Sequence, residues 1–258
     1  MEIRQKQKEV LEKIRRESAE IVQRSLARTR EGELRIAVTR VGYDDVGSVL
    51  AKLNYAFSII DDYDLANYDA LAKYNILFIN CGTGGDSATN RESLKEFVRR
   101  GGVLYVSDLS APQISMAFPN FVEFSSGGVA GQLIVADVVD QDLRNIIGSH
   151  IKIYFDLSDW IHVQGVNRDV HTYLVGSFET NYGRKEDRSI LVSFKYGTGE
   201  VVYTSFHSHK QTSETEEKLL KFLVLKPVSI ASKIPILRLA RDKGLMALEQ
   251  KDIDSQLR

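Results

Sequence analysis

Two histidines in the last quarter of the chain have the side chains best suited to acid–base or metal chemistry. His207 closes an apolar segment that runs from Glu200 to Phe206, and His209 follows two positions later. In an extended segment, two residues at this spacing point to the same side. They could therefore bind a metal ion together or exchange protons near neutral pH. The alternative is that both histidines only hydrogen-bond to the loop after the segment.

An acidic residue, Asp108, follows a second apolar segment, Val103 to Val106. If both segments are parallel strands of one sheet, their carboxyl ends lie at the same edge, where α/β proteins gather their ligand groups. Asp108 could then orient His207 or share a metal ion with it. Asp108, His207 and His209 are the candidate catalytic residues, and the sequence indicates no resident cofactor or metal.

Cys81 is the only cysteine of the chain, which excludes an intramolecular disulfide. It follows a continuous apolar run, and we interpret it as a small apolar residue at a strand end, with a nucleophilic thiol as the alternative. The residues after it, Gly82, Thr83 and Gly84, could present backbone N–H groups to an anion. They lack the lysine of a phosphate-binding P-loop, so a plain strand–helix turn is the competing interpretation.

Short apolar runs alternating with helical patterns predict the elements that would position these residues. Runs of this kind are typical of strands buried on both faces of a parallel sheet. The expected strands are 34–38, 57–60, 75–80, 103–106, 132–139, 151–155, 172–178, 189–196 and 200–206, and the expected helices are 44–53, 91–100, 215–225 and 236–248. Pro227 is expected to stop the third of these helices.

The two ends of the chain predict helical extensions to one α/β domain. Residues 2–30 contain no Gly or Pro and repeat apolar residues at three- and four-residue steps, which is typical of an amphipathic helix. That helix either packs on its own domain or pairs with a partner or a second copy. We therefore expect a helical extension over 1–31, an α/β domain over 32–226 and a C-terminal helical tail over 227–258.

Several motifs follow one another in a recognisable order. They are the first strand, YNILFINCGTGG at 74–85, LKEFVRRGGVLYVSD at 94–108, DLSDW at 156–160 and YGTGEVVYTSFH at 196–207. Their order resembles the class I glutamine amidotransferase-like superfamily, in particular its trehalose-utilisation-like branch. The resemblance covers residues 33–226, about three quarters of the chain. It implies a flavodoxin-like, mostly parallel sheet with helices on both faces.

The same resemblance implies a nucleophile on a strained strand-to-helix elbow, a histidine base and N–H groups that hold an oxyanion. In the amidotransferases the elbow residue is cysteine, whereas this chain has Ser107 and Asp108 there, without flanking glycines. A glycine-free elbow is sterically harder to form. We therefore expect no glutaminase activity. The positions that match the family's ligand-binding region are Gly82, Thr83, Gly84, Ser107, Asp108, Asp159, Trp160 and His207. Trp160 either lines a pocket or belongs to the core.

Charge and hydropathy exclude several other classes of function. Lys and Arg number 34 and Asp and Glu number 35, so the chain has no global basic field for nucleic acid. No window reaches the roughly 20 apolar residues that span a bilayer. Charged residues interrupt the N-terminal segment where a signal peptide would be apolar. We expect a cytoplasmic protein.

Two functions from different classes fit these observations. The first is a non-catalytic amidotransferase-like domain that binds a ligand or a protein partner through its sheet end and terminal helices. The second is an enzyme with altered chemistry, a hydrolase or isomerase on a polar, sugar-like metabolite, that uses Asp108 with His207 and His209. A third polar side chain within reach of His207 in a closed pocket would favour the enzyme.

Overall fold

A computed structural model describes residues 34–207 and 214–245 of the chain. Its main feature is a nine-stranded sheet with the order β2-β1-β3-β4-β11-β10-β9-β6-β7. Five neighbouring strands are parallel: β2 (Ser58–Ile60), β1 (Ile36–Thr39), β3 (Ile76–Ile79), β4 (Val103–Ser107) and β11 (Gly199–Thr204). The other four continue the sheet in antiparallel fashion: β10 (Gly183–Tyr196), β9 (Val170–Thr180), β6 (Gln132–Val138) and β7 (His150–Phe155).

The sheet is therefore mixed. This confirms the expected α/β class, and the expected parallel arrangement holds for the five strands β2, β1, β3, β4 and β11. The short strands β1, β3 and β4 are buried along their whole length, as their continuous apolar runs predict. In β6, buried and exposed residues alternate, because one face of the strand packs on the core and the other does not. The sequence pattern identified these strands but did not reveal their directions.

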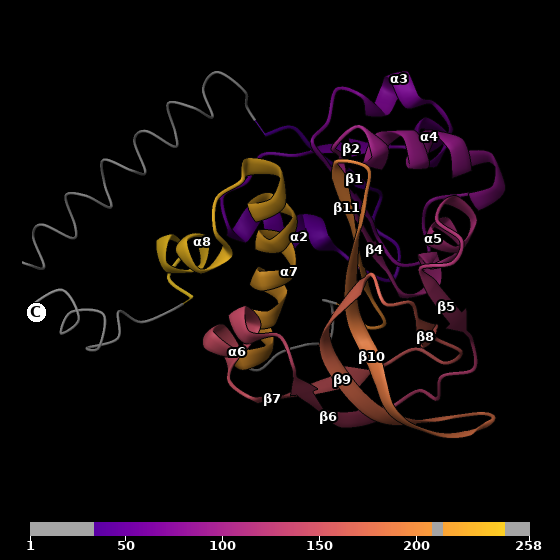
Figure 1. Cartoon of the computed structure of the whole chain (residues 1–258), viewed down its shortest axis with the longest axis vertical. Coiled ribbons are helices and arrows are strands. Elements are labelled where there is room, and N and C mark those ends of the chain that lie inside the picture. Colours follow the sequence, from indigo (N-terminus) through magenta and orange to yellow (C-terminus); the bar gives the residue numbers. More distant parts are fainter. Residues whose placement is uncertain (1–33, 208–213, 246–258) are drawn as a thin grey trace, which may run out of the picture.

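Helices cover both faces of the parallel half, as the sequence indicated (Figure 1). On one face lie α2 (Val46–Lys52), α7 (Glu214–Ser232) and α8 (Ile236–Asp242), while α6 (Gln141–Ile147) packs against α7 and against β6 and β7 of the antiparallel half. On the other lie α3 (Tyr68–Leu71), α4 (Ser87–Arg99), α5 (Pro112–Ala117) and two short 3₁₀ turns, η1 (Asp62–Ala66) and η2 (Asp108–Ser110). A small second sheet pairs β5 (Val122–Ser125) with β8 (His162–Val166).

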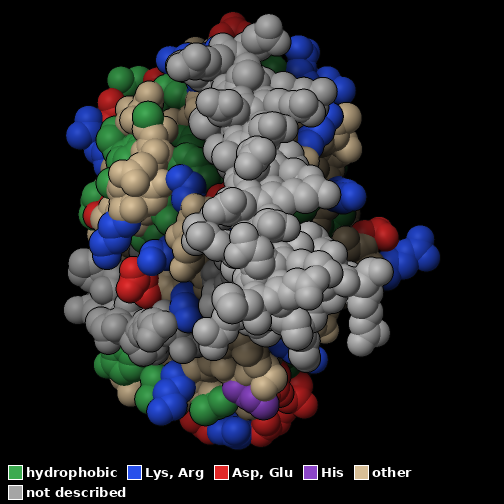
Figure 2. Space-filling view, turned by 90° about the vertical axis from the view of Figure 1, so that its left-hand side faces the viewer, with side chains coloured by type: hydrophobic (Ala, Val, Ile, Leu, Met, Phe, Trp, Pro, Cys, Tyr) green, Lys and Arg blue, Asp and Glu red, His purple; other side chains and the backbone are tan. Residues whose placement is uncertain are grey.

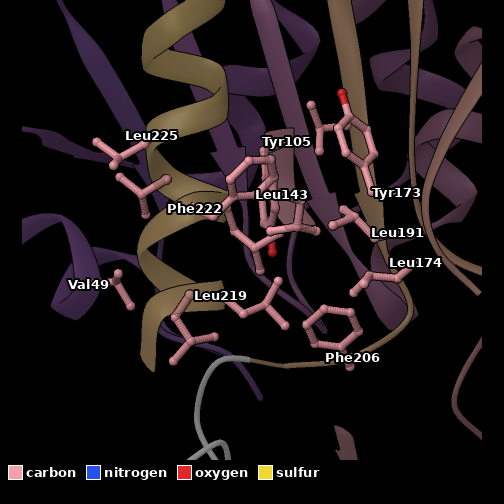
Figure 3. Close-up of a cluster of buried hydrophobic side chains, with 14 of the residues drawn as sticks. Val49, Tyr105, Leu143, Tyr173, Leu174, Leu191, Phe206, Leu219, Phe222 and Leu225 are labelled. Atoms are coloured by element: carbon pink, nitrogen blue, oxygen red, sulfur yellow. The ribbon is translucent and has the colours of Figure 1, made fainter. Parts of the chain in front are cut away.

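The helix α7 supplies much of the first core. Figure 3 shows Leu219, Phe222 and Leu225 projecting from α7, with Phe222 next to Tyr105 and Leu143. Leu219 and Phe222 are three residues apart, which places them on the same side of the helix. Leu219 and Phe222 are almost completely buried, as is Leu225. Burial of this apolar face holds the helix on the sheet.

The expected end of this helix at Pro227 is wrong. The helix α7 continues through Pro227 to Ser232. A proline inside a helix removes one backbone hydrogen bond and crowds the preceding turn, but the apolar face continues beyond it with the buried Val228. Packing of that face outweighs the local penalty. Leu239 and Ala240 of α8 belong to the same core.

Two further expectations differ from the structure, and a third is not tested by it. The fourth expected helix ends as α8 at Asp242, before Gly244 rather than at 248. The second helix begins at Ser87, four residues before the expected start, because Asp86 caps it by accepting the backbone N–H of Ala88. The predicted N-terminal helix at 2–30 and the tail beyond 245 lie outside the described residues.

Candidate functional site

The carboxyl ends of β3, β4 and β11 bring Cys81, Asp108 and His207 together. These three strands are neighbours in the sheet, and each residue lies just beyond the end of its strand. Cys81 and Asp108 have no exposed surface, and His207 is 3% exposed. The expectation that Asp108 and His207 meet at one sheet edge is confirmed by their contact. His209, the other candidate catalytic residue, lies outside the described residues.

Asp108 occupies the turn between β4 and η2 with a backbone φ of +40°. A side chain other than glycine pays roughly 1–2 kcal/mol in this left-handed region. The turn is nevertheless formed without flanking glycines, because both carboxylate oxygens are held. Oδ1 accepts the backbone N–H of Ile161 at 2.6 Å, and Oδ2 accepts from Nε2 of His207 at 2.7 Å. The strained elbow that the sequence made difficult is present, with a carboxylate on it.

His207 lies between two carboxylates. Its Nε2 faces Asp108, and its Nδ1 lies 3.1 Å from Oδ1 of Asp156, an aspartate just beyond β7. Burial lowers the pKa of His207, but the hydrogen bond and the negative charge of Asp108 outweigh that effect and raise it above the usual value. The two carboxylates therefore favour the protonated imidazole, the form that can donate from both ring nitrogens.

Cys81 is in direct contact with this pair, a position that the sequence analysis did not foresee. Its Sγ lies 3.1 Å from Nε2 of His207 and donates to Oδ2 of Asp108 at 3.6 Å. Burial, together with the negative charge of Asp108, raises the pKa of the Cys81 thiol. A buried thiol with a raised pKa is a poor nucleophile, because the thiolate is the reactive form.

A second acidic residue, Asp44, supports the neighbouring strand end. Its Oδ2 accepts the hydroxyl of Ser107 at 3.0 Å, and both residues are buried. Asp44 precedes α2, so this bond ties the first strand–helix connection to the end of β4. Ser107 was among the expected ligand-binding residues, and its hydroxyl is engaged with Asp44 inside the protein.

The glycine loop after β3 uses its polar groups within the protein. The N–H of Thr83 donates to the carbonyl of Asn80 at 3.1 Å, and the N–H of Gly84 donates to Oδ1 of Asp62 at 2.9 Å. The carbonyl of Gly84 accepts from Gln113 at 2.9 Å. Gly82 and Gly84 both have positive φ, which the turn requires. Thr83 and Gly84 thus donate to protein acceptors, as in the strand–helix turn of the competing interpretation.

Trp160 is a core residue. It is 1% exposed and stacks on Phe155 with ring centroids 3.9 Å apart. Its Nε1 donates to the carbonyl of Val129 at 3.2 Å. Its neighbour Asp159 is exposed, with φ +60°. The aspartate that reaches His207 is therefore Asp156, although Asp159 was the expected ligand-binding residue of this segment.

Comparison with known proteins supports the fold. Neither a protein-family model nor a curated protein matches the sequence. Among solved structures, a ThuA-like protein from Bacteroides uniformis has a TM-score of 0.58 at 13% identity and covers 77% of this chain and 91% of its own. The N-terminal domain of IFT52 has a TM-score of 0.56 at 13% identity, and the match covers 76% of this chain and 97% of that domain.

A GMP synthase protein from Thermoplasma acidophilum is similar to the same degree. Its TM-score is 0.54 at 14% identity, and the match covers 78% of this chain and 94% of the other. The chain has the class I glutamine amidotransferase-like fold, as its motifs indicated. At these identities the likeness concerns the fold alone, so the chemistry of the site has to be argued from the residues themselves.

Proposed function

We infer that this chain is a non-catalytic amidotransferase-like domain that works by binding, in the first place to a protein partner or a second copy. The observation that carries this proposal is the state of Asp108 at the elbow. Both of its oxygens accept hydrogen bonds from protein groups, and its side chain has no exposed surface. Nucleophilic catalysis needs an activated group that a substrate can approach. Asp108 instead holds His207 in place.

The described surface supports a binding role. Leu133 and Val135 of β6 are 58% and 61% exposed, while Ile134 and Ala136 beside them are buried in the core. Exposed apolar side chains gathered on one strand are typical of interaction surfaces. Among its described residues, the face in Figure 2 carries both basic and acidic side chains. Such a mixture fits a protein partner better than nucleic acid, whose phosphates bind to predominantly basic surfaces.

In the described part of the chain, no helix is long and apolar enough to cross a membrane. As a separate proposal, we place the protein in the cytoplasm.

The apolar stripe predicted for residues 2–30 is the second argument for assembly. Deleting residues 1–30 tests the assembly role by light scattering. A truncated protein that stays folded but loses self-association or its partner supports it, and an insoluble truncation of a monomeric protein contradicts it.

Catalysis is tested on the same full-length chain by ammonia release from glutamine. We expect none above background, because the elbow offers no thiol. Release of ammonia that disappears in Cys81→Ala would contradict both the non-catalytic proposal and the placement of Asp108 at the elbow. Cys81→Ala removes the only sulfhydryl of the chain, so the comparison has no second cysteine to confuse it.

An enzyme with altered chemistry, a hydrolase or isomerase on a polar, sugar-like metabolite, is the second candidate. It is favoured by one observation, the row Asp108–His207–Asp156, in which a histidine has a carboxylate on each ring nitrogen. A histidine oriented by a carboxylate is one element of acid–base machinery. A panel of nitrophenyl esters and glycosides tests it. Turnover that is lost in His207→Ala, and kept in a variant of the exposed His171, would favour the enzyme.

A further inference from the structure

The cluster at the end of β3, β4 and β11 also brings together three atoms of the kinds that bind transition metals. They are Sγ of Cys81, Oδ2 of Asp108 and Nε2 of His207, all within 4.8 Å of one another. Each atom comes from a different strand end, so the sheet itself fixes their separation. All three side chains are buried, which excludes competition from bulk water at most of their surface.

The distances between these atoms are close to those of a tetrahedral metal site. Nε2 of His207 lies 2.7 Å from Oδ2 of Asp108 and 3.1 Å from Sγ of Cys81, and Sγ lies 3.6 Å from Oδ2. Zinc bonds of ordinary length at tetrahedral angles would separate such donor atoms by roughly 3.3–3.6 Å. The sulfur and the oxygen already have this spacing. The imidazole would have to withdraw by about half an ångström to admit the ion.

The far side of the imidazole has the arrangement that metal-binding histidines use. A ligating histidine usually donates its other ring N–H to a carboxylate or a carbonyl, which fixes the tautomer and the orientation of the ring. Nδ1 of His207 lies 3.1 Å from Oδ1 of Asp156, and the side chain of Asp156 is 17% exposed. Nε2 is thereby aimed at Cys81 and Asp108. This is an observation independent of the three ligand atoms.

The donor types decide which ion fits. One sulfur, one imidazole nitrogen and one carboxylate oxygen suit a borderline-soft divalent ion, whereas magnesium and calcium prefer oxygen ligands throughout. A thiolate and a carboxylate together supply two negative charges, which match those of a divalent cation.

We propose that Cys81, Asp108 and His207 bind a zinc ion, with Asp156 as the positioning residue that orients His207. The ion joins the ends of β3, β4 and β11 at one point and takes the place of the direct Asp108–His207 hydrogen bond. Its binding releases to solvent the thiol proton of Cys81 and the proton on Nε2 of His207. Its role is to hold the strand ends together. The proposal is independent of the binding role proposed above, because it concerns what stabilises the domain and not what the domain recognises.

Zinc titration of the full-length, chelator-treated protein is the test. We expect uptake of about one ion per chain and a higher melting temperature at saturating zinc. Cobalt, used as a coloured substitute for zinc, should show the absorption of a sulfur–cobalt bond. Cys81→Ser should abolish that band and the rise in melting temperature. Asp156→Asn, which keeps all three ligands, should weaken zinc binding by roughly 10- to 100-fold.

The matched control is the double variant His150→Ala, His171→Ala. Both histidines are exposed and each pairs with an aspartate, so they represent ordinary surface sites for adventitious metal. The control should bind zinc as the unaltered protein does. The proposal is overturned if the protein takes up no zinc, if Cys81→Ser binds it equally well, or if the double variant loses it.

Two further readouts keep the test decisive. If Cys81→Ser does not fold by circular dichroism, the cobalt spectrum of the unaltered protein decides, and a spectrum without a sulfur band overturns the proposal. Zinc binding without turnover on the ester and glycoside panel leaves the non-catalytic role intact. Turnover that needs zinc would contradict that role while supporting the metal site, so the two proposals fail in different ways.

Discussion

Oδ2 of Asp108 and Nε2 of His207 lie 2.7 Å apart, although the two residues are 99 positions apart along the chain. Their contact joins the ends of β4 and β11 inside the protein, where neither side chain has more than 3% of its surface exposed. A charged pair in such a place is costly to break, because the remaining partner is left buried without its counterpart. The contact also holds Asp108 in its left-handed backbone conformation.

Replacing Asp108 should separate these two effects. We expect Asp108→Ala to lower the free energy of unfolding by roughly 3–5 kcal/mol, because His207 loses its buried partner. Asp108→Gly loses the same partner, but glycine adopts a positive φ without steric strain. The glycine variant should therefore be more stable than the alanine variant by about 1 kcal/mol. Urea unfolding of the metal-free protein measures both. Equal stability of the two variants would contradict the strain at Asp108.

Asp137 provides the control for this pair. It contacts His150 at 3.2 Å, but both side chains are more than 60% exposed. Surface pairs of this kind contribute little. Asp137→Ala should therefore leave the urea midpoint almost unchanged, and a loss as large as that of Asp108→Ala would show that burial is not the cause.

Gly128 is expected to tolerate no side chain. A Cβ at this position would overlap the indole ring of Trp160, which is stacked on Phe155 and buried. Overpacking of this kind typically costs 1–3 kcal/mol and sometimes more. We expect Gly128→Ala to lose about 3 kcal/mol or more in thermal or urea unfolding. Gly131→Ala is the matched comparison, since a Cβ there meets nothing within 4 Å and only its positive φ is strained.

Pro227 should be a site where the protein can be stabilised. The helix α7 runs through this proline to Ser232, so one backbone hydrogen bond is missing within it. Pro227→Ala restores that N–H and should raise the free energy of unfolding by roughly 1–3 kcal/mol. Differential scanning calorimetry measures the change. A lower melting temperature would mean that the packing of the proline ring outweighs the restored hydrogen bond.

Cys81 should resist alkylation in the folded protein. Its thiol has no exposed surface, and burial with the nearby charge of Asp108 raises its pKa, so the reactive thiolate is scarce at neutral pH. We expect iodoacetamide to label the chain only after urea is added, as followed by mass spectrometry. Rapid labelling of the native protein at pH 7 would instead indicate an accessible, activated thiol and a catalytic role for it.

The sequence was most informative where a residue follows a short, fully buried strand. Asp108 and His207 could be placed together because strands of continuous apolar character predict a parallel sheet, and the carboxyl ends of such strands meet. Cys81 follows β3 in the same way, and its burial was predicted correctly. Its contact with His207 was missed, because the apolar pattern does not determine the order of the strands in the sheet.

Asp156 was missed for a related reason. It lies at the end of β7, and β7 is antiparallel to β6 at the far edge of the sheet. Its approach to His207 depends on how the chain returns from that edge through Trp160 to Ile161, whose N–H binds Asp108. Strand directions in the antiparallel half could not be predicted from alternation alone. The motif around Asp156 to Trp160 was recognised, but spacing gave no means of choosing Asp156 over Asp159.

The helix at Pro227 shows the opposite limit, because there a strong local signal was overridden. Proline is the residue least compatible with a helix interior, and the apolar face on both sides of it was present in the sequence. The burial of Leu225 and Val228 decides in favour of the helix. Tertiary packing of this kind cannot be weighed against a local penalty until the partner surface is known.

The position of β11 has a consequence for how the protein is made. β11 pairs with β4 on one side and with β10 on the other, yet it is the last strand of the sheet along the described chain. On the ribosome, β4 therefore emerges long before the strand that covers it. Until then it is an unpaired apolar edge, the kind of edge that aggregates or needs a chaperone. The nascent chain is most vulnerable in this interval, which ends when β11 enters the sheet and His207 meets Asp108.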